Sequence, residues 1–473
     1  MSDSPEIPTS WLRLTLGDAI DYGKTIKAKP SEIPADAWVL ELEDIEKDTS
    51  QLLQRLTFAE RQSKSTKNRF AAGDVLYGKL RPYLNKVLIA NQDGYCTTEI
   101  VPLKPNLAIY ERYLFYWLKH SEFLSYVESV SHGIQMPRLG TEAGLKAPLI
   151  LAPLNEQRRI VAKLDRLFAR SRCAREELGR VSGLVQRYKQ AVLAAAFRGD
   201  LTADWRAENL LTPAIRCSSA LYDPPTAIDL REYFDLPKSW VWDFVGHLSN
   251  VVRGASPRPA GNPKYFGGNI PWITVGYLTA DENPYLTIDK ISTFLTEEGK
   301  KKSRFIEAGT LMLTNSGATL GVPKIITFGG CFNDGSVALL NINHPLKLYL
   351  YYFLRFLTSR YRAIHQGAAQ PNLNIDIVKS TPVPIPPVEE QKEIVKRVEK
   401  LFKAINLIEQ EHQKASKLLD RLEKATLSKA FRGELVPQDP NDEPAAVLLE
   451  RIQAQRQTQP KRKAKSTRKP KAN

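Results

Sequence analysis

The sequence feature that most constrains this chain is a stretch of six residues that occurs twice. Residues 196–201 read AFRGDL, and residues 430–435 read AFRGEL, 234 residues later. With the same offset, residues 155–169 align with residues 389–403, and the match continues without a gap into the two AFRG stretches. Because loops tolerate insertions and long helices do not, an ungapped match of this length indicates a rigid element that the chain contains twice.

The residues inside both segments predict long helices, because apolar positions recur at steps of four and three. Glu156 and Glu390 lie in the first turns, where the helix dipole favours acidic residues. Gly199 and Gly433 follow at the position of a left-handed C-cap. A heptad pattern of this length favours two helices that bury their seams against each other. The first row consists of Ile160, Leu164, Leu167, Ser171, Ala174, Leu178, Val181, Val185, Tyr188, Val192 and Ala195, and the second of Ile394, Val398, Leu401, Ile405, Ile408, His412, Ala415, Leu419, Leu422, Thr426 and Lys429.

The segments before the helices repeat more faintly. Residues 71–82 resemble residues 307–318, each with a short apolar stretch after a glycine that predicts a strand. We therefore expect an α/β protein with an internal two-fold pseudo-repeat. Its expected parts are two similar globular domains at 1–154 and 206–385, two long coiled-coil helices at 155–205 and 386–440, and a short amphipathic helix with a basic tail at 441–473.

The net charge of +15 is typical of a protein with a nucleic-acid partner. The charge is concentrated at the C-terminus, because residues 451–473 hold nine Lys and Arg and no acidic residue. Residues 459–473 have the composition of a disordered segment. Such a tail either contacts DNA phosphates or stays in solvent, and its sequence leaves both open.

Several classes of site are excluded by spacing. The longest apolar run, residues 147–154, is far shorter than the ~20 residues of a membrane helix. The four cysteines are scattered and form no C-x-x-C, which favours a reducing cytoplasm over disulfides or zinc. The GKT of residues 23–25 lacks the upstream glycine that a phosphate loop needs. We therefore expect a protein that binds and organises, with no catalytic residue and no metal site.

The doubled helix motif, which begins with NEQRRIV and EEQKEIV and ends with AFRGDL and AFRGEL, resembles the specificity subunit of Type I restriction–modification systems. The GDVLYGKLRP of residues 73–82 shares this resemblance. It implies that each globular domain is a target recognition domain for one half of a bipartite DNA sequence. It also implies that the two helices form an antiparallel coiled coil, which sets the length of the unread spacer between the half-sites.

The same resemblance implies partners. Two methyltransferase subunits and the restriction–motor subunits would assemble on this chain in the cytoplasm, and double-stranded DNA would be the ligand. The chain itself would be no enzyme. S-adenosylmethionine, ATP and Mg would then belong to the partner subunits.

Candidate contact residues follow from chemistry, because base readout needs donors and acceptors whereas phosphates need only positive charge. In the first domain the candidates for DNA are Lys64, Lys67, Arg69, Lys79, Arg81, Tyr83, Gln135 and Arg138. In the second they are Arg253, Ser256, Arg258, Lys300, Lys301, Lys302, Arg304, Asn315, Ser316, Thr319, Asn372 and Asn374. The helix ends supply the candidates for the methyltransferase subunits, namely Phe197, Arg198, Gly199, Phe431, Arg432 and Gly433.

Two other functions remain compatible with the residues alone. A coiled-coil adaptor whose domains bind proteins would show little salt dependence of binding to duplex DNA. A self-contained DNA-modifying enzyme would transfer methyl groups as a purified single chain.

The ruler role of the helices gives the first testable prediction. Inserting four residues near Ala174 should lengthen the first helix by roughly 6 Å, at about 1.5 Å per residue. Because stacked base pairs rise about 3.4 Å, the spacer should grow by about one to two base pairs while both half-sites stay the same. Sequencing of methylated sites measures both quantities. An unchanged spacer in an active variant would contradict the ruler role.

Overall fold

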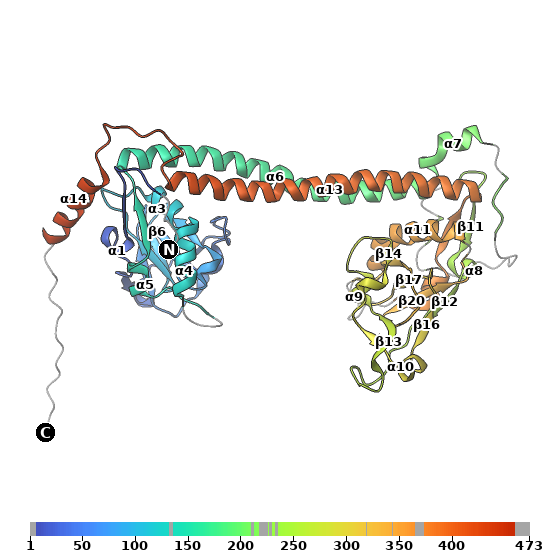
Figure 1. The fold of residues 1–473 in the computed structure, drawn as a ribbon. Coiled ribbons are helices and arrows are strands. Elements are labelled where there is room, and N and C mark those ends of the chain that lie inside the picture. Colours follow the sequence, from blue (N-terminus) through green and yellow to red (C-terminus); the bar gives the residue numbers. More distant parts are fainter. Residues whose placement is uncertain are drawn as a thin grey trace, which may run out of the picture. The chain divides into compact units, whose positions relative to one another are not determined.

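The computed structural model describes residues 6–131, 136–209, 212–216, 226, 229–231, 235–317, 319–342, 344–364 and 373–458. The chain forms two compact units (Figure 1). Unit 1 contains Met1–Leu178 and Gln413–Asn473, and unit 2 contains Gly179–His412. Each unit consists of one globular domain and about half of each long helix. The boundaries between the units therefore fall inside the long helices, which the sequence analysis treated as separate segments.

The globular domain of unit 1 is built on three sheets. They have the strand orders β2-β5-β8-β3-β4, β7-β6-β9 and β1-β10. Most neighbours are antiparallel, and β3 with β8 is a parallel pair. The strands are β1 (Leu12–Thr15), β2 (Ile26–Ala28), β3 (Trp38–Leu40), β4 (Leu56–Thr57), β5 (Lys67–Phe70), β6 (Val75–Gly78), β7 (Val87–Ile89), β8 (Gly94–Thr97), β9 (Ile100–Leu103) and β10 (Pro148–Leu151), and the main helices are α3 (Glu111–Trp117) and α4 (Ser121–Val130).

The globular domain of unit 2 repeats this scaffold. Its sheets have the orders β12-β20-β17-β18-β14, β15-β13-β19-β16 and β11-β21. The strands are β11 (Val241–Phe244), β12 (Asn250–Arg253), β13 (Phe266–Ile273), β14 (Tyr285–Leu286), β15 (Phe294–Leu295), β16 (Arg304–Ile306), β17 (Leu311–Thr314), β18 (Pro323–Ile326), β19 (Gly330–Phe332), β20 (Ser336–Leu340) and β21 (Pro382–Ile385), and the helices include α10 (Glu297–Lys301), α11 (His344–Ala363) and α12 (Ile375–Lys379).

Strand pairing confirms that the two domains are structural repeats. In unit 1, β6 lies between β7 and β9, and in unit 2, β17 lies between β18 and β20. The parallel pair of β3 and β8 has its counterpart in the parallel pair of β13 and β19. The strands predicted from residues 71–82 and 307–318 are β6 and β17. The sequence therefore predicted the repeat correctly although the two domains share few residues.

The long helices are α6 (Leu154–Arg198) and α13 (Val388–Phe431). They are antiparallel, because in unit 1 Arg175 of α6 pairs with Glu423 of α13, and in unit 2 Lys189 of α6 pairs with Glu409 of α13. Both helices end at the glycines that the sequence marked. Gly199 has a φ of 83° and Gly433 a φ of 77°, which is the left-handed conformation that glycine adopts without strain.

The predicted heptad rows are buried or half-buried along most of both long helices, but Ala174, Tyr188, Ile408, Leu422 and Lys429 are exposed. Tyr188, Ile408 and Leu422 are 57%, 54% and 59% exposed, so the prediction that they lie in the seam is wrong. Near Tyr188 the buried side chain is that of the next residue, Lys189, which is only 3% exposed, whereas Val185 and Val192 of the predicted row are buried. An α-helix has 3.6 residues per turn, so a strict 3.5-residue pattern drifts around the helix by about 20° per heptad.

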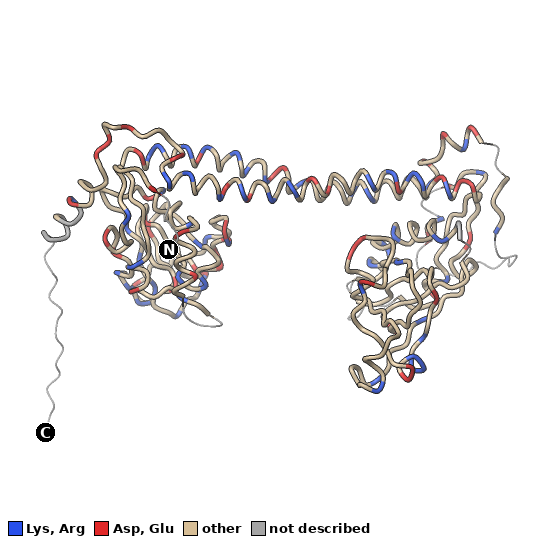
Figure 2. Tube along the Cα trace, viewed as in Figure 1, with Lys and Arg blue, Asp and Glu red and all other residues tan. Residues whose placement is uncertain are grey.

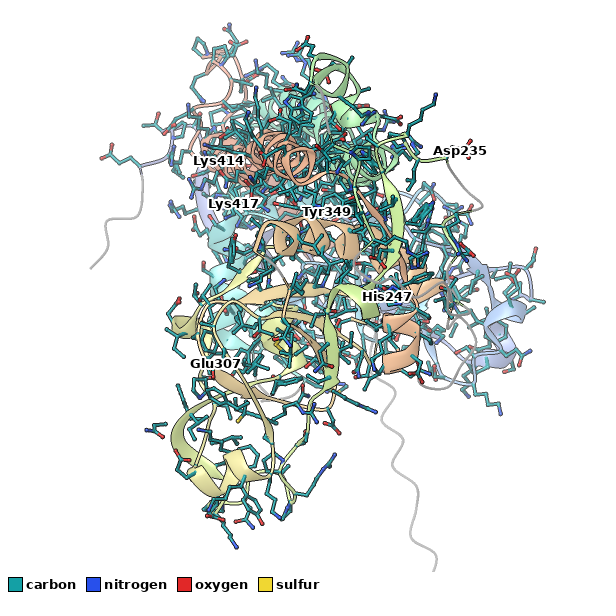
Figure 3. The ribbon with its side chains drawn as sticks, turned by 90° about the vertical axis from the view of Figure 1, so that its right-hand side faces the viewer. Asp235, His247, Glu307, Tyr349, Lys414 and Lys417 are labelled. Atoms are coloured by element: carbon teal, nitrogen blue, oxygen red, sulfur yellow. The ribbon has the colours of Figure 1, made fainter. Side chains whose placement is uncertain are left out.

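The end of each long helix packs into the domain that precedes the other helix. In unit 1, the ring of Phe431 contacts Tyr113 and Trp117 at centroid distances of 5.2 and 5.0 Å. In unit 2, the ring of Phe197 contacts Tyr349 and Phe353 at 5.3 and 5.1 Å. Figure 3 shows Tyr349 on α11 below the helices of this unit. The AFRG motif recurs because each copy fills an equivalent aromatic cluster.

This packing corrects the predicted partner contacts at the helix ends. Phe197 and Phe431 are both fully buried, so their rings are core residues and are not displayed to another subunit. The neighbouring Arg198 and Arg432 are more accessible, and they pair with Asp200 and Glu434 at 2.9 and 2.7 Å. At these two turns, only the charged groups reach the surface.

A buried carboxylate anchors the start of each long helix. Glu156 accepts a hydrogen bond of 2.8 Å from the indole Nε1 of Trp11 in unit 1. Glu390 accepts a bond of the same length from Trp240 in unit 2. The next residues repeat as well, because the side-chain amides of Gln157 and Gln391 donate to the carbonyl oxygens of Ala152 and Pro386. Each helix is thus fixed to the last strand of its own domain.

The segment after α13 returns to unit 1. Arg159 and Asp442 form a two-pronged ion pair, and the backbone N–H of Ala445 donates to the carbonyl of Ser10 at 3.0 Å. The expected short helix is α14 (Ala445–Thr458). The basic tail, residues 459–473, lies outside the described residues. No helix among the described residues is long and apolar enough to cross a membrane.

The exchange of helix ends gives a prediction about stability. Replacing Phe431 with alanine should cost about 3–5 kcal/mol, the usual range for a buried aromatic residue. The loss should loosen residues 111–127 of unit 1, whereas Phe197→Ala should loosen residues 344–361 of unit 2. Hydrogen exchange measured on peptides from the two variants tests this crossed pattern, with Leu184→Ala at an exposed site as the control. Equal loosening of both regions by either variant would contradict it.

Candidate nucleic-acid interface

The domain of unit 1 contains a pocket of about 300 Å³ with a polar and basic lining. Three cationic side chains face it, those of Lys27, Lys79 and Arg138. No acidic residue is among the described residues that line it. The remaining lining residues are Tyr22, Gly23, Thr25, Asn68, Thr98, Val101, Leu139, Gly140 and Thr141. Cations and hydroxyl groups around a concave surface are suited to a phosphate group or the polar edge of a base.

Backbone hydrogen bonds hold two of these cations together. Lys79 directly follows β6, and its carbonyl accepts from the N–H of Leu139 at 3.0 Å. The N–H of Lys79 donates to the carbonyl of Glu99 at 2.9 Å, and the Glu99 carboxylate pairs with Arg138 Nε at 3.1 Å. The loop that carries Arg138 is therefore tied to the end of β6, and Glu99 orients the guanidinium group.

Two buried polar side chains in the same pocket keep unused hydrogen-bonding capacity. Asn68 is 3% exposed, and its amide nitrogen donates to the carbonyl of Ile100 at 2.9 Å. Its Oδ1 has no partner among the described residues, and neither has the hydroxyl of Tyr22. Burial raises the pKa of Tyr22 well above its usual value, so the hydroxyl stays protonated and can donate. Buried groups of this kind need a ligand or water to complete their hydrogen bonds.

The other residues of this domain that were predicted to contact DNA differ in their exposure. Lys64, Arg69, Arg81 and Tyr83 are exposed and accessible to a ligand. Gln135 lies outside the described residues. The prediction for Lys67 is wrong, because its side chain is 2% exposed and its Nζ donates to Glu41 at 2.6 Å. An ammonium group that is buried against a carboxylate cannot reach a phosphate without breaking that pair.

In unit 2, three predicted residues converge on Asp334. Ser256 donates to its Oδ1 at 2.6 Å, and Arg253 Nε donates to its backbone carbonyl at 3.0 Å. Arg258 lies 3.8 Å from its Oδ2 and is 76% exposed. The hydrogen bond from Ser256, helped by the two arginines, lowers the pKa of Asp334 and keeps it ionised. The backbone carbonyl of Asp334 therefore holds the guanidinium group of Arg253, and its carboxylate attracts that of Arg258, at one edge of the domain.

A second basic cluster surrounds α10, at the end of this domain farthest from α13 (Figures 1 and 2). Lys300 lies over the ring of Phe305 at 4.7 Å, and Lys301 pairs with Glu298. Lys302 and Arg304 are exposed. The structure brings these four predicted residues together, as the sequence run of basic residues implied.

Two predicted residues of unit 2 are amides in different surroundings. Asn315 is 1% exposed, and its Oδ1, like that of Asn68, has no partner among the described residues. Asn374 caps α12, because its Oδ1 accepts from the N–H of Ile377 at 2.8 Å. Asn374 is exposed, so its contact with DNA stays a prediction, although its amide already serves as a cap. Ser316 and Thr319 are half-buried beside them, and Asn372 lies outside the described residues.

Several residues of these sites escaped prediction from sequence. Lys27, Asn68 and Tyr22 come from strand and turn segments with no motif, and only the fold brings them to the pocket. Glu99 and Asp334 are acidic, so a search for positive charge passed over them. Asp334 had a usable signal, because Asn333, Asp334 and Gly335 form a sequence typical of a tight turn. Among the described residues, no group of three His, Cys, Asp or Glu side chains could hold a metal ion.

Comparisons with known proteins place the chain in a family. The family model described as Type I restriction modification DNA specificity domain matches residues 15–178 and 237–417. The specificity subunit of the Type I restriction enzyme EcoDI from Escherichia coli is 32% identical over 205 residues, which are 43% of this chain and 45% of that protein. The EcoKI specificity subunit from Escherichia coli K12 is 24% identical over 75% of this chain and 74% of its own length.

A solved structure shares the fold over most of the chain. It comes from a study of the complex assembly and conformational transition of a Type I restriction–modification system. Its TM-score is 0.73 at 20% identity, and the alignment covers 91% of this chain and all of the other. Because the family model covers both repeats, the chain belongs to the family of Type I restriction–modification DNA specificity subunits, which recognise DNA sequence and are not catalytic.

Proposed function

We propose that the domains of unit 1 and unit 2 each read one half of a bipartite DNA target. The observation that carries this proposal is a shared backbone arrangement with exchanged side chains. The N–H of Leu139 donates to the carbonyl of Lys79 in unit 1, and the N–H of Leu373 donates to the carbonyl of Asn315 in unit 2. The same two loops are therefore joined in the same way, but Lys79 is replaced by a buried amide.

This difference supports two distinct half-sites. In unit 1, the pocket of Lys27, Lys79 and Arg138 offers three positive charges and the free polar atoms of Asn68 and Tyr22. In unit 2, the accessible groups are instead Arg253 and Arg258 at Asp334, together with the basic cluster of α10. Lysines suit phosphates, whereas guanidinium groups held in a fixed orientation suit the acceptors of guanine.

The partners and the location of the chain are also part of the proposal. Two methyltransferase subunits and the restriction–motor subunits assemble on this chain, and S-adenosylmethionine, ATP and Mg bind to them. We place the complex in the cytoplasm, where thiols stay reduced. The free thiols of Cys96, Cys173 and Cys331 are compatible with that location.

Exposed apolar residues on the long helices replace the helix-end phenylalanines as the candidate methyltransferase contacts. Leu184 and Tyr188 of α6 are 54% and 57% exposed. Leu418 and Leu422 of α13, at the equivalent positions of the repeat, are 61% and 59% exposed. Large apolar side chains that repeat on a helix surface are typical of an interface. The two-fold repeat supplies two such pairs, which agrees with two copies of one partner.

The bipartite proposal predicts that matched arginine variants affect different half-sites. Arg138→Ala should relax base preference in one half-site and Arg258→Ala in the other, each by about 1–3 kcal/mol for a lost base contact. Sequencing of methylated sites in cells that carry each variant measures both effects. Lys396→Ala serves as the control, since it removes one exposed charge from α13, outside both clusters.

Two outcomes would contradict the bipartite proposal. If both variants changed the same half-site, the two domains would not read separate sequences. If binding of the purified chain to duplex DNA were independent of salt, the phosphates would not contribute, and an adaptor that binds proteins would be favoured.

The docking surface gives a separate prediction about stoichiometry. Changing Leu184 and Tyr188 to aspartate should remove one of two methyltransferase subunits, and changing Leu418 and Leu422 should remove the other. The charges oppose burial of these positions in an interface, and they should leave the fold intact because the side chains are more than half exposed. Native mass spectrometry of the reconstituted complexes counts the subunits. Two bound subunits in both variants would place the docking surface elsewhere.

A further inference from the structure

The two long helices are equivalent in sequence but opposite in charge at a few positions. Along the ungapped match, the sign of the charge reverses at three pairs of equivalent residues. These are Arg159 and Glu393, Arg175 and Glu409, and Lys189 and Glu423. Other charged positions keep their sign, such as Glu177 with Glu411 and Arg180 with Lys414. The reversals are therefore exceptions to a conservative pattern.

Residues at two of these three reversals form ion pairs between the helices. In unit 1, Arg175 of α6 lies 3.0 Å from Glu423 of α13. In unit 2, Lys189 of α6 lies 3.1 Å from Glu409 of α13. Position 175 of α6 is equivalent to position 409 of α13, and position 189 of α6 to position 423 of α13. Both ion pairs therefore join the same two positions of the repeat. In each unit, the positive charge comes from α6 and the negative charge from α13.

The third reversal does not join the helices. Arg159 pairs with Asp442 in the segment after α13, and Glu393 pairs with Arg397 one turn along its own helix. Arg175 has a further partner in Asp420 of α13 at 2.8 Å, and Lys189 has one in Glu282 of the unit 2 domain at 2.7 Å. Of the two ion pairs, the one between Arg175 and Glu423 therefore has partners on the helices alone.

The ion pairs lie where the two helices meet, and Lys189 is the buried member while the other three side chains are partly exposed. The side chain of Lys189 is 3% exposed, and those of Glu423, Glu409 and Arg175 are 32%, 38% and 43% exposed. These residues occupy the places that the heptad rows assigned to Tyr188, Leu422 and Ile408, whose side chains point outward. Charges that flank the contact between paired helices act on partner choice, and a mismatched pair at the buried Lys189 is only weakly screened by water.

The identical motifs of the two helices create a competing arrangement. Each helix starts with a glutamate that binds a tryptophan and ends with an AFRG motif that fills an aromatic cluster. Phe197 could therefore occupy the cluster that Phe431 fills, if α6 paired with α6 of a second copy of this chain. The apolar contacts alone do not distinguish this pairing from the pairing of α6 with α13.

The charges do distinguish the two arrangements. In an antiparallel α6 pair of the same register, Arg175 would face Lys189 of the other copy. In an α13 pair, Glu409 would face Glu423 of the other copy. Both contacts bring like charges together, and each would occur twice. We propose that the charge reversal at these four positions selects the pairing of α6 with α13 within one chain and rejects pairing of like helices between two copies.

One double variant separates the effect of these charges on the choice of helix partner from their effect on the stability of the fold. Exchanging the charges in Arg175→Glu with Glu423→Arg keeps the net charge and restores an opposite pair at that contact within the chain. The exchange also makes each helix complementary to itself. The new carboxylate at position 175 can face Lys189 of a second copy, and the new guanidinium group at position 423 can face Glu409.

The double variant and its two single variants should differ in stability. The double variant loses the contact of Arg175 with Asp420 but keeps an opposite pair at positions 175 and 423, so it should unfold at a higher temperature than Arg175→Glu alone, yet it should no longer reject a second copy. Each single change should lower the unfolding midpoint by roughly 2–4 °C, a typical shift for one lost interaction in units of this size.

The experiment is refolding of the full chain over a range of concentrations, followed by light scattering on a sizing column. The wild type should refold as a monomer, whereas the double variant should form a dimer whose fraction rises at least tenfold over that of the wild type. Arg166→Glu with Glu399→Arg is the matched control, since it exchanges the same residue types at exposed positions. An equal dimer fraction in the wild type and the double variant would overturn the proposal. So would a dimer fraction in the control as high as that in the double variant.

Discussion

A buried glutamate at the start of each long helix is the contact on which the rest of the structure depends. Glu156 and Glu390 are 1% and 0% exposed, and burial of a carboxylate is costly unless several donors surround it. Trp11 and Gln438 supply them in unit 1, and Trp240, Thr202 and Arg206 in unit 2. These donors come from before and after the helices. One side chain therefore fixes the helix, the first strand pair and the returning chain, and through them the loops that carry the candidate DNA contacts.

The helices and the repeat could be predicted because their signals are local. An apolar period and a constant offset identify a helix and its copy without any knowledge of packing. The outward position of Tyr188 required the true helical period over the full length of α6, and the burial of Phe197 required contacts with Tyr349 and Phe353, which are distant in the sequence. A sequence pattern shows which face of a helix is apolar. Only the tertiary structure shows which residues of that face are buried against other elements.

The candidate interface was less predictable, because the type of a residue does not reveal its exposure. Lys67 and Asn315 have the chemistry of DNA contacts but lie in the core. Glu99 and Asp334 have the opposite charge and nevertheless orient the arginines beside them. A basic run such as residues 300–304 is easier to interpret, since several consecutive charges cannot all be buried. Polar residues near tight turns are the most ambiguous, because caps and ligands use the same side chains.

The contacts of the two helix-ending glycines have a consequence for the order of the chain. Gly199 packs against Pro237, and the chain runs on from one to the other. Gly433 packs in the same way against Pro8, although these two residues lie at opposite ends of the sequence. The equivalent contact therefore joins neighbouring segments of the sequence in unit 2 and distant segments in unit 1. A circular permutant that joins the end of α14 to residue 6 by a linker and opens the chain between residues 209 and 235 would therefore keep Gln438, Asp442 and every helix and strand described above.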